Sequence, residues 1–335
     1  ITSMVLYTIW VEKMIKKLIL AAAPIIDLVL IPFVIFSAII LKAYRRFGSM
    51  RLSLNTKILK LIGVFPIRDH YNEPFFNDSH LKKTLGEKRK LPGIDFRHDE
   101  QLNFLKGLTY QKDFDMFIEK QKSTNINSRF ILDNDSFESG DAEFLFNLVR
   151  HLKPNKVIEI GCGASTKLIS AALDLNTEKA DKRGDHICIE PYQQPWLASF
   201  GNIQLLRQKV EDIDIELFSS LDSSDLLFID SSHIIRPQGD VLHEYLEIVP
   251  KLNKGVFVHV HDIFTPHDYL ENWVKKSVFF WNEQYLLEAL LSNNRSYEIV
   301  AALNYLKHEE YDALKKVCPY LETSREPGSF YFKIV

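Results

Sequence analysis

Residues 157–166 read VIEIGCGAST, and this stretch decides how the rest of the chain is interpreted. A short apolar strand is followed by two glycines, and a helix-forming segment begins directly after them. Glycines at such a turn let the backbone bend tightly and approach a ligand, and the helix N-terminus behind them presents free N–H groups. A Gly-x-Gly pair alone is common, but its place between a strand and a helix favours a ligand-binding turn.

The chain around this turn alternates between strand and helix patterns. Strands are expected at 157–160, 186–190, 203–206, 226–230, 255–260, 297–301 and 330–335, and helices at 165–173, 241–252 and 281–291. Strands that alternate with helices indicate a parallel sheet covered on both faces, and unbroken apolar strands such as LLFI agree with burial on both sides. The sequence therefore predicts a doubly wound α/β domain.

Acidic residues follow the second and third expected strands. In an open α/β sheet, ligands bind at the carboxyl ends of the strands. Glu190 ends the second strand, 31 residues after Glu159, where a carboxylate can accept hydrogen bonds from ribose hydroxyls. The alternative is that Glu190 caps the next helix. Asp212 follows the third strand, where it is either a contact for an adenine amino group or a solvated loop acid.

A second polar group follows the fourth and fifth expected strands. Asp230 ends the fourth strand, with His233 close behind it, and His261 and Asp262 end the fifth. If these strands are neighbours, the side chains converge, and they can hold a divalent cation or transfer a proton. We expect His259, one layer deeper along the fifth strand, to be a core histidine.

The N-terminal region contains an apolar segment, Leu18–Leu41, whose only charged residue is Asp27. About 20 apolar residues suffice for a membrane-spanning helix. Three basic residues precede this segment (Lys13, Lys16 and Lys17) and six follow it (Lys42, Arg45, Arg46, Arg51, Lys57 and Lys60). The heavier positive flank predicts a spanning helix with the C-terminal side in the cytoplasm. A buried hairpin or an interfacial helix is the alternative.

Composition restricts the function classes. The chain has 335 residues and a formal charge of −3, so no global field steers it toward nucleic acid. Its three cysteines (Cys162, Cys188 and Cys318) are far apart and odd in number, which argues against a disulfide scaffold and for a reducing compartment. We expect a membrane-anchor region at 1–47, a connector and cover segment at 48–130, and the α/β domain at 131–335.

Several blocks together resemble a known family. VIEIGCGASTKLI (157–169), CIEPY (188–192), VEDI (210–213), DLLFIDSSH (225–233) and GSFYFKI (328–334) resemble class I S-adenosylmethionine-dependent methyltransferases. The likeness is strongest to a bacterial branch with FIDSSH, VHVHDIF (258–264) and WNEQYLL (281–287) blocks. It implies a Rossmann-like sheet of about seven strands with the last strand antiparallel.

The resemblance also implies roles for individual residues. Glu159, Gly161, Cys162 and Gly163 would surround the methionine part of S-adenosylmethionine. Glu190 would hold the ribose, Asp212 the adenine, and Asp230 would lie by the reactive methyl group. In related cation-dependent O-methyltransferases, acids after the fourth and fifth strands bind a divalent metal. The matching residues here are Asp230, His261 and Asp262, with Mg²⁺ or Mn²⁺ as the ion, although the family has an acid–amide pair where this chain has His261-Asp262.

Together with the resemblance, these residues imply an enzyme that methylates an oxygen, with nitrogen as the second choice, of a small or a membrane-associated acceptor such as a lipid-linked or glycan-linked one. Asp230, His233 or His261 would be the base. Three rivals differ in what they require. A metallohydrolase using His259 and His261 requires an eightfold barrel. An NAD-dependent oxidoreductase requires a third glycine where position 166 is Thr. A membrane-anchored scaffold without catalysis has no need of the polar residues at the strand ends.

Overall fold

The computed structural model describes residues 2–124, 129–177 and 182–335, with side chains from residue 19 onward. It divides into two compact units, Ile1–Lys82 and Lys83–Val335. This boundary falls inside the 48–130 segment that the sequence analysis treats as one connector. We refer to the two parts as the N-terminal unit and the C-terminal unit.

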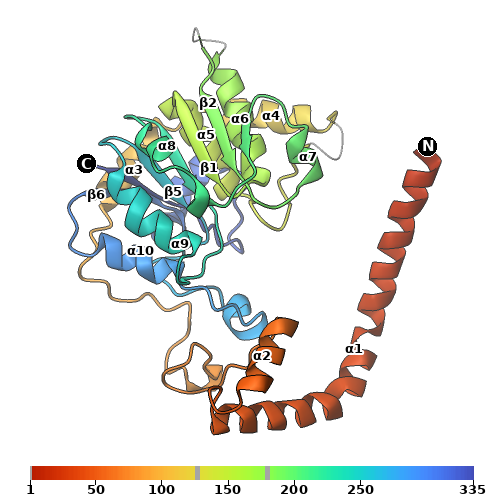
Figure 1. The fold of residues 1–335 in the computed structure, drawn as a ribbon. Coiled ribbons are helices and arrows are strands. Elements are labelled where there is room, and N and C mark those ends of the chain that lie inside the picture. Colours follow the sequence, from red (N-terminus) through yellow and green to blue (C-terminus); the bar gives the residue numbers. More distant parts are fainter. Residues whose placement is uncertain (1, 125–128, 178–181) are drawn as a thin grey trace. The chain divides into compact units, whose positions relative to one another are not determined.

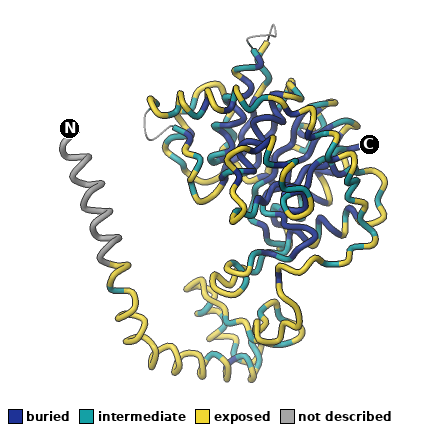
Figure 2. Tube along the Cα trace, turned by 180° about the vertical axis from the view of Figure 1, so that it is seen from behind, coloured by how far each residue is buried: buried dark blue, intermediate teal, exposed yellow. Residues whose placement is uncertain are grey.

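The N-terminal unit begins with a long helix, α1 (Thr2–Phe47). Its part from Ile19 to Phe47 is long and apolar enough to cross a membrane, by length and composition alone. The described side chains of this part are almost all exposed (Figure 2). Pro24 and Pro32 lie inside α1, and the helix bends along its length (Figure 1). The side chains of Lys13, Lys16, Lys17 and Leu18, which belong to the predicted anchor and its flank, lie outside the described residues.

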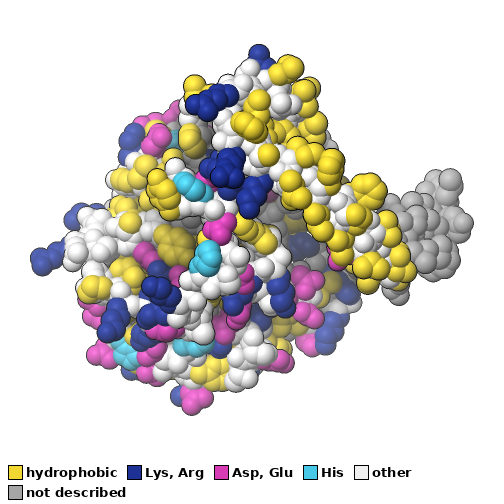
Figure 3. Space-filling view, turned by 90° about the horizontal axis from the view of Figure 1, so that it is seen from below, with side chains coloured by type: hydrophobic (Ala, Val, Ile, Leu, Met, Phe, Trp, Pro, Cys, Tyr) yellow, Lys and Arg dark blue, Asp and Glu magenta, His cyan; other side chains and the backbone are white. Residues whose placement is uncertain are grey.

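A tight corner joins α1 to the short helix α2 (Ser53–Ile62). The hydroxyl groups of Tyr44 and Thr56 form a hydrogen bond, and Thr56 also donates to the Ser49 carbonyl at 2.7 Å. Tyr44 is buried. Lys and Arg side chains gather beside the apolar surface of α1 (Figure 3). A single-turn helix, η1 (Asp78–His80), is the remaining helical element of this unit.

The C-terminal unit contains the seven strands that the sequence and the resemblance predict. The strands are β1 (Lys156–Ile160), β2 (Asp185–Ile189), β3 (Gln204–Leu206), β4 (Leu226–Ile229), β5 (Phe257–Val260), β6 (Tyr297–Ala302) and β7 (Phe330–Ile334). The α-helices are α3 (His98–Gly107), α4 (Gln111–Gln121), α5 (Asp141–Leu152), α6 (Ala164–Thr177), α7 (Pro195–Ala198), α8 (Glu216–Ser219), α9 (Asp240–His243), α10 (Glu283–Leu291), α11 (Leu303–Glu309) and α12 (Tyr311–Val317). The short 3₁₀ and π segments are η2 (Val210–Asp212), η3 (Glu244–Ile248), η4 (Val249–Lys251) and η5 (Asn272–Lys276).

The strands form one sheet in the order β3-β2-β1-β4-β5-β7-β6. Strands β1 to β5 pair in parallel, and β7 runs antiparallel to both β5 and β6. The α/β fold with an antiparallel last strand is therefore confirmed. Strand order reverses between β1 and β4, which makes their carboxyl ends the switch point of the sheet.

Each face of the sheet packs against its own apolar core. On one face, Val157, Leu226 and Phe228 pack in one cluster with side chains of α4, α5 and α6. On the other, Ile158 and Leu227 belong to a cluster that includes residues of α9, η3 and α10. Successive strand residues alternate between the two clusters, as a strand buried on both faces requires. This double burial fixes the strands, and so the residues at their carboxyl ends.

Residues 83–130 do more than connect. The sequence predicts a connector and cover segment here, and helices α3 and α4 form within it and pack by Leu105, Phe114 and Phe117. The Arg89 guanidinium forms salt bridges with Glu288 and Asp268. These apolar and charged contacts hold the segment in the C-terminal unit.

Glycine is required at position 161 but not at 163. A Cβ on Gly161 would lie 1.8 Å from the Asp230 carbonyl oxygen, and Gly161 has φ +79°, whereas a Cβ on Gly163 would meet nothing within 4 Å.

We expect Gly161→Ala to lower the free energy of unfolding by at least about 2 kcal/mol, since a left-handed backbone alone costs about 1–2 kcal/mol. Gly163→Ala should leave it nearly unchanged. Urea unfolding of the full chain in detergent measures both, and equal stability of the two variants would contradict this assignment.

Candidate active site at the carboxyl ends of the strands

A cavity of about 220 Å³ opens at the switch point of the sheet. The turn after β1 and the start of the loop after β4 lie in direct contact here, since the Asp230 N–H donates to the Ile160 carbonyl at 2.9 Å. The lining residues are Ile160, Gly161, Ile189, Glu190, Pro191, Tyr192, Lys209, Val210, Glu211, Asp230, Ser231, Ser232, Arg236 and Asp240. The cavity thus brings together Gly161, Glu190 and Asp230, which the sequence assigned to one cofactor site.

Glu190 is tied to the glycine turn. Its carboxylate accepts hydrogen bonds from the backbone N–H groups of Cys162, at 3.2 Å, and Tyr192, at 2.8 Å. Gln194 donates to the Cys162 carbonyl at 2.7 Å. A carboxylate has about four lone-pair positions, so Glu190 can still accept a bond from a ligand in the cavity. The structure therefore places Glu190 both as an anchor of the turn and on the cavity wall.

Glu159 faces the interior of the protein. It is fully buried, and its carboxylate accepts hydrogen bonds from Ser165 at 2.7 Å and Thr166 at 3.0 Å. On its other side it contacts the imidazole of His186 at 2.9 Å. These contacts join the end of β1 to the first turn of α6. Glu159 thus holds the shape of the glycine turn from behind, and it does not line the cavity.

The acid that lines the cavity after β3 is Glu211. Asp212, which the resemblance assigned to adenine, is exposed and does not belong to the lining. Both residues lie in the single-turn helix η2, where consecutive side chains point in different directions. Sequence alone cannot tell which of two adjacent acids faces inward when the backbone between them is helical.

The residues after β4 and β5 do converge. His233 Nε2 lies 3.4 Å from a carboxylate oxygen of Asp230 and 3.4 Å from one of Asp262. His261 Nδ1 lies 3.4 Å from the other oxygen of Asp262 and 3.8 Å from Asp230. His233 and Asp262 have φ +61° and +57°, a left-handed conformation that is uncommon for such residues. At these strand ends, Asp230, His233 and Asp262 form a compact group that can offer three ligand atoms to one metal, all within 4.8 Å of one another.

This group differs from the predicted metal set in one member. The predicted ligands are Asp230, His261 and Asp262, whereas in the structure His233 takes the place of His261 in the compact group. His261 nevertheless faces the same two carboxylates, and its Nε2 is buried with no hydrogen-bond partner in the described residues. Two carboxylates and an imidazole fit a divalent cation such as Mn²⁺ or Mg²⁺.

Charges in this group favour two protonated histidines. Burial opposes the charge on His233, but contacts with Asp230 and Glu283 outweigh it and hold its pKa well above the ordinary value. For His261, burial is likewise outweighed by the carboxylates of Asp262 and Asp230, which raise its pKa to about 9. Burial tends to raise the pKa of Asp230, yet the nearby His261 and His233 keep it below its usual value. In the metal-free protein at neutral pH, Asp230 is therefore deprotonated, while His233 and His261 both carry a proton.

His233 is held from behind by residues to which the sequence analysis gave no role. Its Nδ1 lies 2.8 Å from Glu283, whose other oxygen accepts a hydrogen bond from the Tyr245 hydroxyl at 3.0 Å. The ring of Trp281 lies 4.4 Å from that of His233, centroid to centroid. Trp281 and Glu283 both lie in the WNEQYLL block. The resemblance therefore includes this segment, but it implied no role for either residue.

His259 is a core histidine, as expected. It is fully buried, stacks on Phe228 with ring centroids 4.0 Å apart, and contacts the Ser329 hydroxyl at 3.1 Å. Burial and the nearby His261 charge lower its pKa well below the ordinary value. A neutral imidazole in the core is part of the packing beneath the site.

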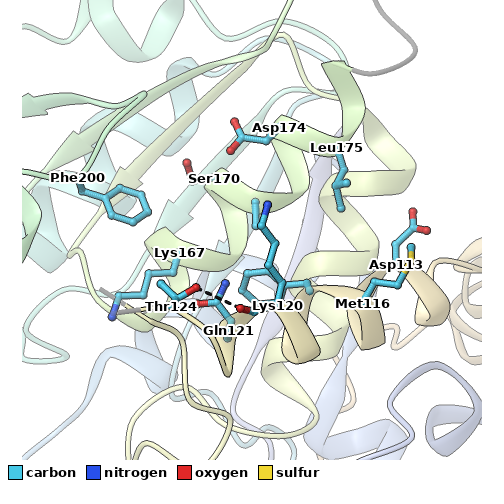
Figure 4. Close-up of a pocket in the computed structure, with 12 residues that line it drawn as sticks. Asp113, Met116, Lys120, Gln121, Thr124, Lys167, Ser170, Asp174, Leu175 and Phe200 are labelled. Carbon is cyan, nitrogen blue, oxygen red and sulfur yellow. Dashed lines mark hydrogen bonds between the residues drawn. The ribbon is translucent and has the colours of Figure 1, made fainter. Parts of the chain in front are cut away.

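A larger cavity of about 640 Å³ lies away from the strand ends (Figure 4). It is lined mainly by α4 and α6, with Lys120, Lys167 and Asp174 among its polar side chains. Lys167 donates to the Arg129 carbonyl at 2.9 Å and lies over the Trp196 ring. None of the predicted site residues lines this cavity. We therefore do not assign it as the candidate active site, although it is larger than the cavity at the strand ends.

Residues 158–263 match a family model described as a methyltransferase domain. This segment is similar to methyltransferase domains. It extends from within β1 to just beyond β5 and therefore contains the glycine turn, Glu190, Asp230 and His261. An uncharacterized protein from Archaeoglobus fulgidus is 29% identical over 171 residues, which is 48% of this chain and 75% of that protein.

Two solved structures show weaker likenesses to this chain. One is the plantazolicin methyltransferase BpumL, solved with a triazolic desmethylPZN analog and SAH, at 10% identity over 71% of this chain and 97% of that chain, with a TM-score of 0.33. The other, from Plasmodium falciparum, is described as a protein-L-isoaspartate O-methyltransferase, at 10% identity over 48% and 83% of the chains, with a TM-score of 0.26. At these scores neither structure decides fold or function.

The raised pKa of His261 predicts how stability depends on pH. Its pKa is about 9 in the folded chain against 6.5 ordinarily, so the stabilisation is complete below pH 6.5 and disappears as pH rises through 9. The free energy of unfolding of the wild type, relative to His261→Gln, should fall by about 3 kcal/mol over that interval, at about 1.4 kcal/mol per pKa unit. Urea unfolding at both pH values, with chelator present, measures this, and a constant difference between the proteins would refute it.

Proposed function

We propose that the chain is an S-adenosylmethionine-dependent methyltransferase acting on an oxygen nucleophile. The observation that carries this proposal is the coincidence of the methyltransferase-domain match with the cavity lined by Gly161, Glu190 and Asp230. The cofactor would supply an electrophilic methyl group. Thr166 stands where a dinucleotide-binding turn would have its third glycine, and this disfavours NAD.

The site has the features that such a cofactor needs. Gly163 leaves open space beside the turn, and the N-terminus of α6 presents backbone N–H groups there. Glu190 would accept bonds from ribose hydroxyls, and Glu211 rather than Asp212 would be the acid nearest the adenine. The cavity is smaller than the usual range of about 300–1,000 Å³ for ligand sites, so the cofactor would extend across its rim along the glycine turn.

Asp230 is the residue that we assign as proton acceptor. It lies at the end of a strand buried on both faces, so its backbone is fixed and it can align with the acceptor hydroxyl. His233 and His261 carry protons in the metal-free state, so they would stabilise the Asp230 carboxylate. A divalent cation, if bound, would be held by Asp230, His233 and Asp262 and would lower the pKa of the acceptor hydroxyl.

Aromatic side chains beside His233 would contact the acceptor. Trp281 stacks with Phe279 at 4.7 Å and packs edge-on with Trp273 at 5.0 Å, and Phe279 is exposed. Such a wall suits an acceptor with a flat apolar or ring-shaped part, and a saccharide or a lipid-linked group meets that description. We further propose that α1 anchors the chain in a membrane with the methyltransferase domain in the cytoplasm, on the strength of its apolar length and the basic residues after it.

The rival functions fit the structure less well. An eightfold barrel is absent from the described residues, whose one sheet is open and has seven strands, and His259 is buried in the core rather than exposed as a metal ligand. A scaffold without catalysis would not need two left-handed residues, His233 and Asp262, to converge on Asp230. A measurement of turnover therefore distinguishes a scaffold without catalysis from an enzyme.

We expect Asp230→Asn to lower turnover by about 10²-fold or more, as removal of a general base does, while S-adenosylmethionine binding is nearly unchanged. Formation of S-adenosylhomocysteine by the full chain, with hydroxylated glycans and lipids as acceptors, measures turnover, and calorimetry measures binding. Asp268→Asn, at a carboxylate outside the cavity lining, is the matched control. Undiminished turnover in Asp230→Asn would remove Asp230 from the mechanism.

The metal is tested in the same assay. Loss of turnover in chelator, restored by Mn²⁺ or Mg²⁺, would support a cation held by Asp230, His233 and Asp262. Turnover that persists in chelator would exclude the cation and leave Asp230 as the base.

A further inference from the structure

Helix α2 has a large apolar face that the described residues of the N-terminal unit leave uncovered. Leu54, Ile58, Leu61 and Ile62 are separated by four, three and one residues, and at 100° per residue they share one side of the helix. Their side chains are 48–89% exposed. A soluble protein rarely leaves four neighbouring apolar side chains of one helix in water, so this face indicates a binding surface.

The opposite face of α2 is already occupied. Thr56 and Leu59 are half-buried, and Thr56 is fixed by hydrogen bonds to Tyr44 of α1 and to the Ser49 carbonyl. The turn between the helices is closed by the Gly48 carbonyl, which accepts from the N–H groups of Arg51 at 3.1 Å and Leu52 at 3.2 Å. The position of α2 against the end of α1 is therefore set, and its apolar face points away from that contact.

The charged residues near α2 indicate which kind of surface its apolar face would contact. Residues 42–68 include seven basic side chains and no Asp or Glu: Lys42, Arg45, Arg46, Arg51, Lys57, Lys60 and Arg68. Glu73 pairs with Arg45 at 2.7 Å and with Arg68 at 2.8 Å. Among the residues that the structure describes, none of the other five forms a salt bridge. A helix with one apolar face flanked by lysines, beside a membrane-spanning segment, matches the chemistry of an anionic lipid surface.

We propose that α2 lies in the headgroup region of an anionic membrane leaflet, with Leu54, Ile58 and Leu61 directed toward the acyl chains and the nearby basic residues against lipid phosphates. This inference rests on the proposed anchoring of α1 and deepens it. It adds a second, separate membrane contact at the point where α1 leaves the bilayer. The two contacts together would fix the direction in which the chain continues from the membrane surface.

Site-directed spin labelling of the full chain in vesicles tests the proposal. The three native cysteines are buried, so a thiol-reactive nitroxide will mark an introduced cysteine selectively. Ile58→Cys places the label on the apolar face, and Lys60→Cys, about 200° away around the helix, is the matched control. Power saturation then compares accessibility to oxygen, which enriches in lipid, with accessibility to a water-soluble nickel chelate.

In vesicles of phosphatidylcholine and phosphatidylserine, we expect the oxygen-to-nickel ratio to be several-fold higher at position 58 than at position 60. Equal, water-like ratios at both positions would overturn the proposal. Low accessibility to both reagents at position 58 would mean that protein covers the face, as a second copy would, and would overturn it equally. The ratio at position 58 should also fall in pure phosphatidylcholine, and an unchanged ratio there would refute the anionic part of the proposal.

A third label separates this proposal from the anchoring of α1. Val34→Cys places the nitroxide in the apolar part of α1. A lipid-like ratio at position 34 with a water-like ratio at position 58 would refute the α2 contact and retain the anchor. Water-like ratios at both positions 34 and 58 would refute the two together.

Discussion

The close approach of β1 and β4 at their carboxyl ends is the constraint on which the site depends. A hydrogen bond of 2.9 Å joins the Asp230 N–H to the Ile160 carbonyl, and the space beside Gly161 is too small for any Cβ. Because the strands are buried on both faces, this contact cannot slide without disrupting two cores. It fixes the glycine turn and the Asp230 carboxylate relative to each other, as the proposed alignment of a methyl donor and an acceptor would require.

A buried polar framework supports the contact from both sides. Behind the glycine turn, Glu159 holds Ser165 and Thr166, while in front of it Glu190 accepts from the Cys162 N–H. Around Asp230, the carboxylates of Asp230 and Asp262 lie next to the imidazoles of His233 and His261, so each charged group has a neighbour of opposite charge. Within this network His261 Nε2 is buried without a hydrogen-bond partner in the described residues, and an unpaired charge in the interior costs several kcal/mol. The loss of one carboxylate should therefore affect its neighbours as well.

Much of this arrangement could be predicted from the sequence. Strand order in a doubly wound fold makes the fourth and fifth strands neighbours, so the convergence of Asp230, His261 and Asp262 followed from their places at strand ends. What could not be predicted depends on local backbone geometry. Glu211 rather than Asp212 faces the cavity because of a single helical turn, and His233 joins the two carboxylates because it has a positive φ. The helices α3 and α4, and the boundary between Lys82 and Lys83, depend on packing contacts that no local pattern reports.

The central claim is that the turn from Gly161 to Gly163 binds S-adenosylmethionine. Titration calorimetry of the full chain in detergent with S-adenosylmethionine and, separately, with NAD tests it most directly. Gly163→Val is the comparison because a Cβ at position 163 meets no protein atom within 4 Å. The account predicts saturable binding of S-adenosylmethionine by the wild type, loss of that binding in folded Gly163→Val, and no binding of NAD. Equal affinity of the two proteins for S-adenosylmethionine, or binding of NAD in its place, would contradict it.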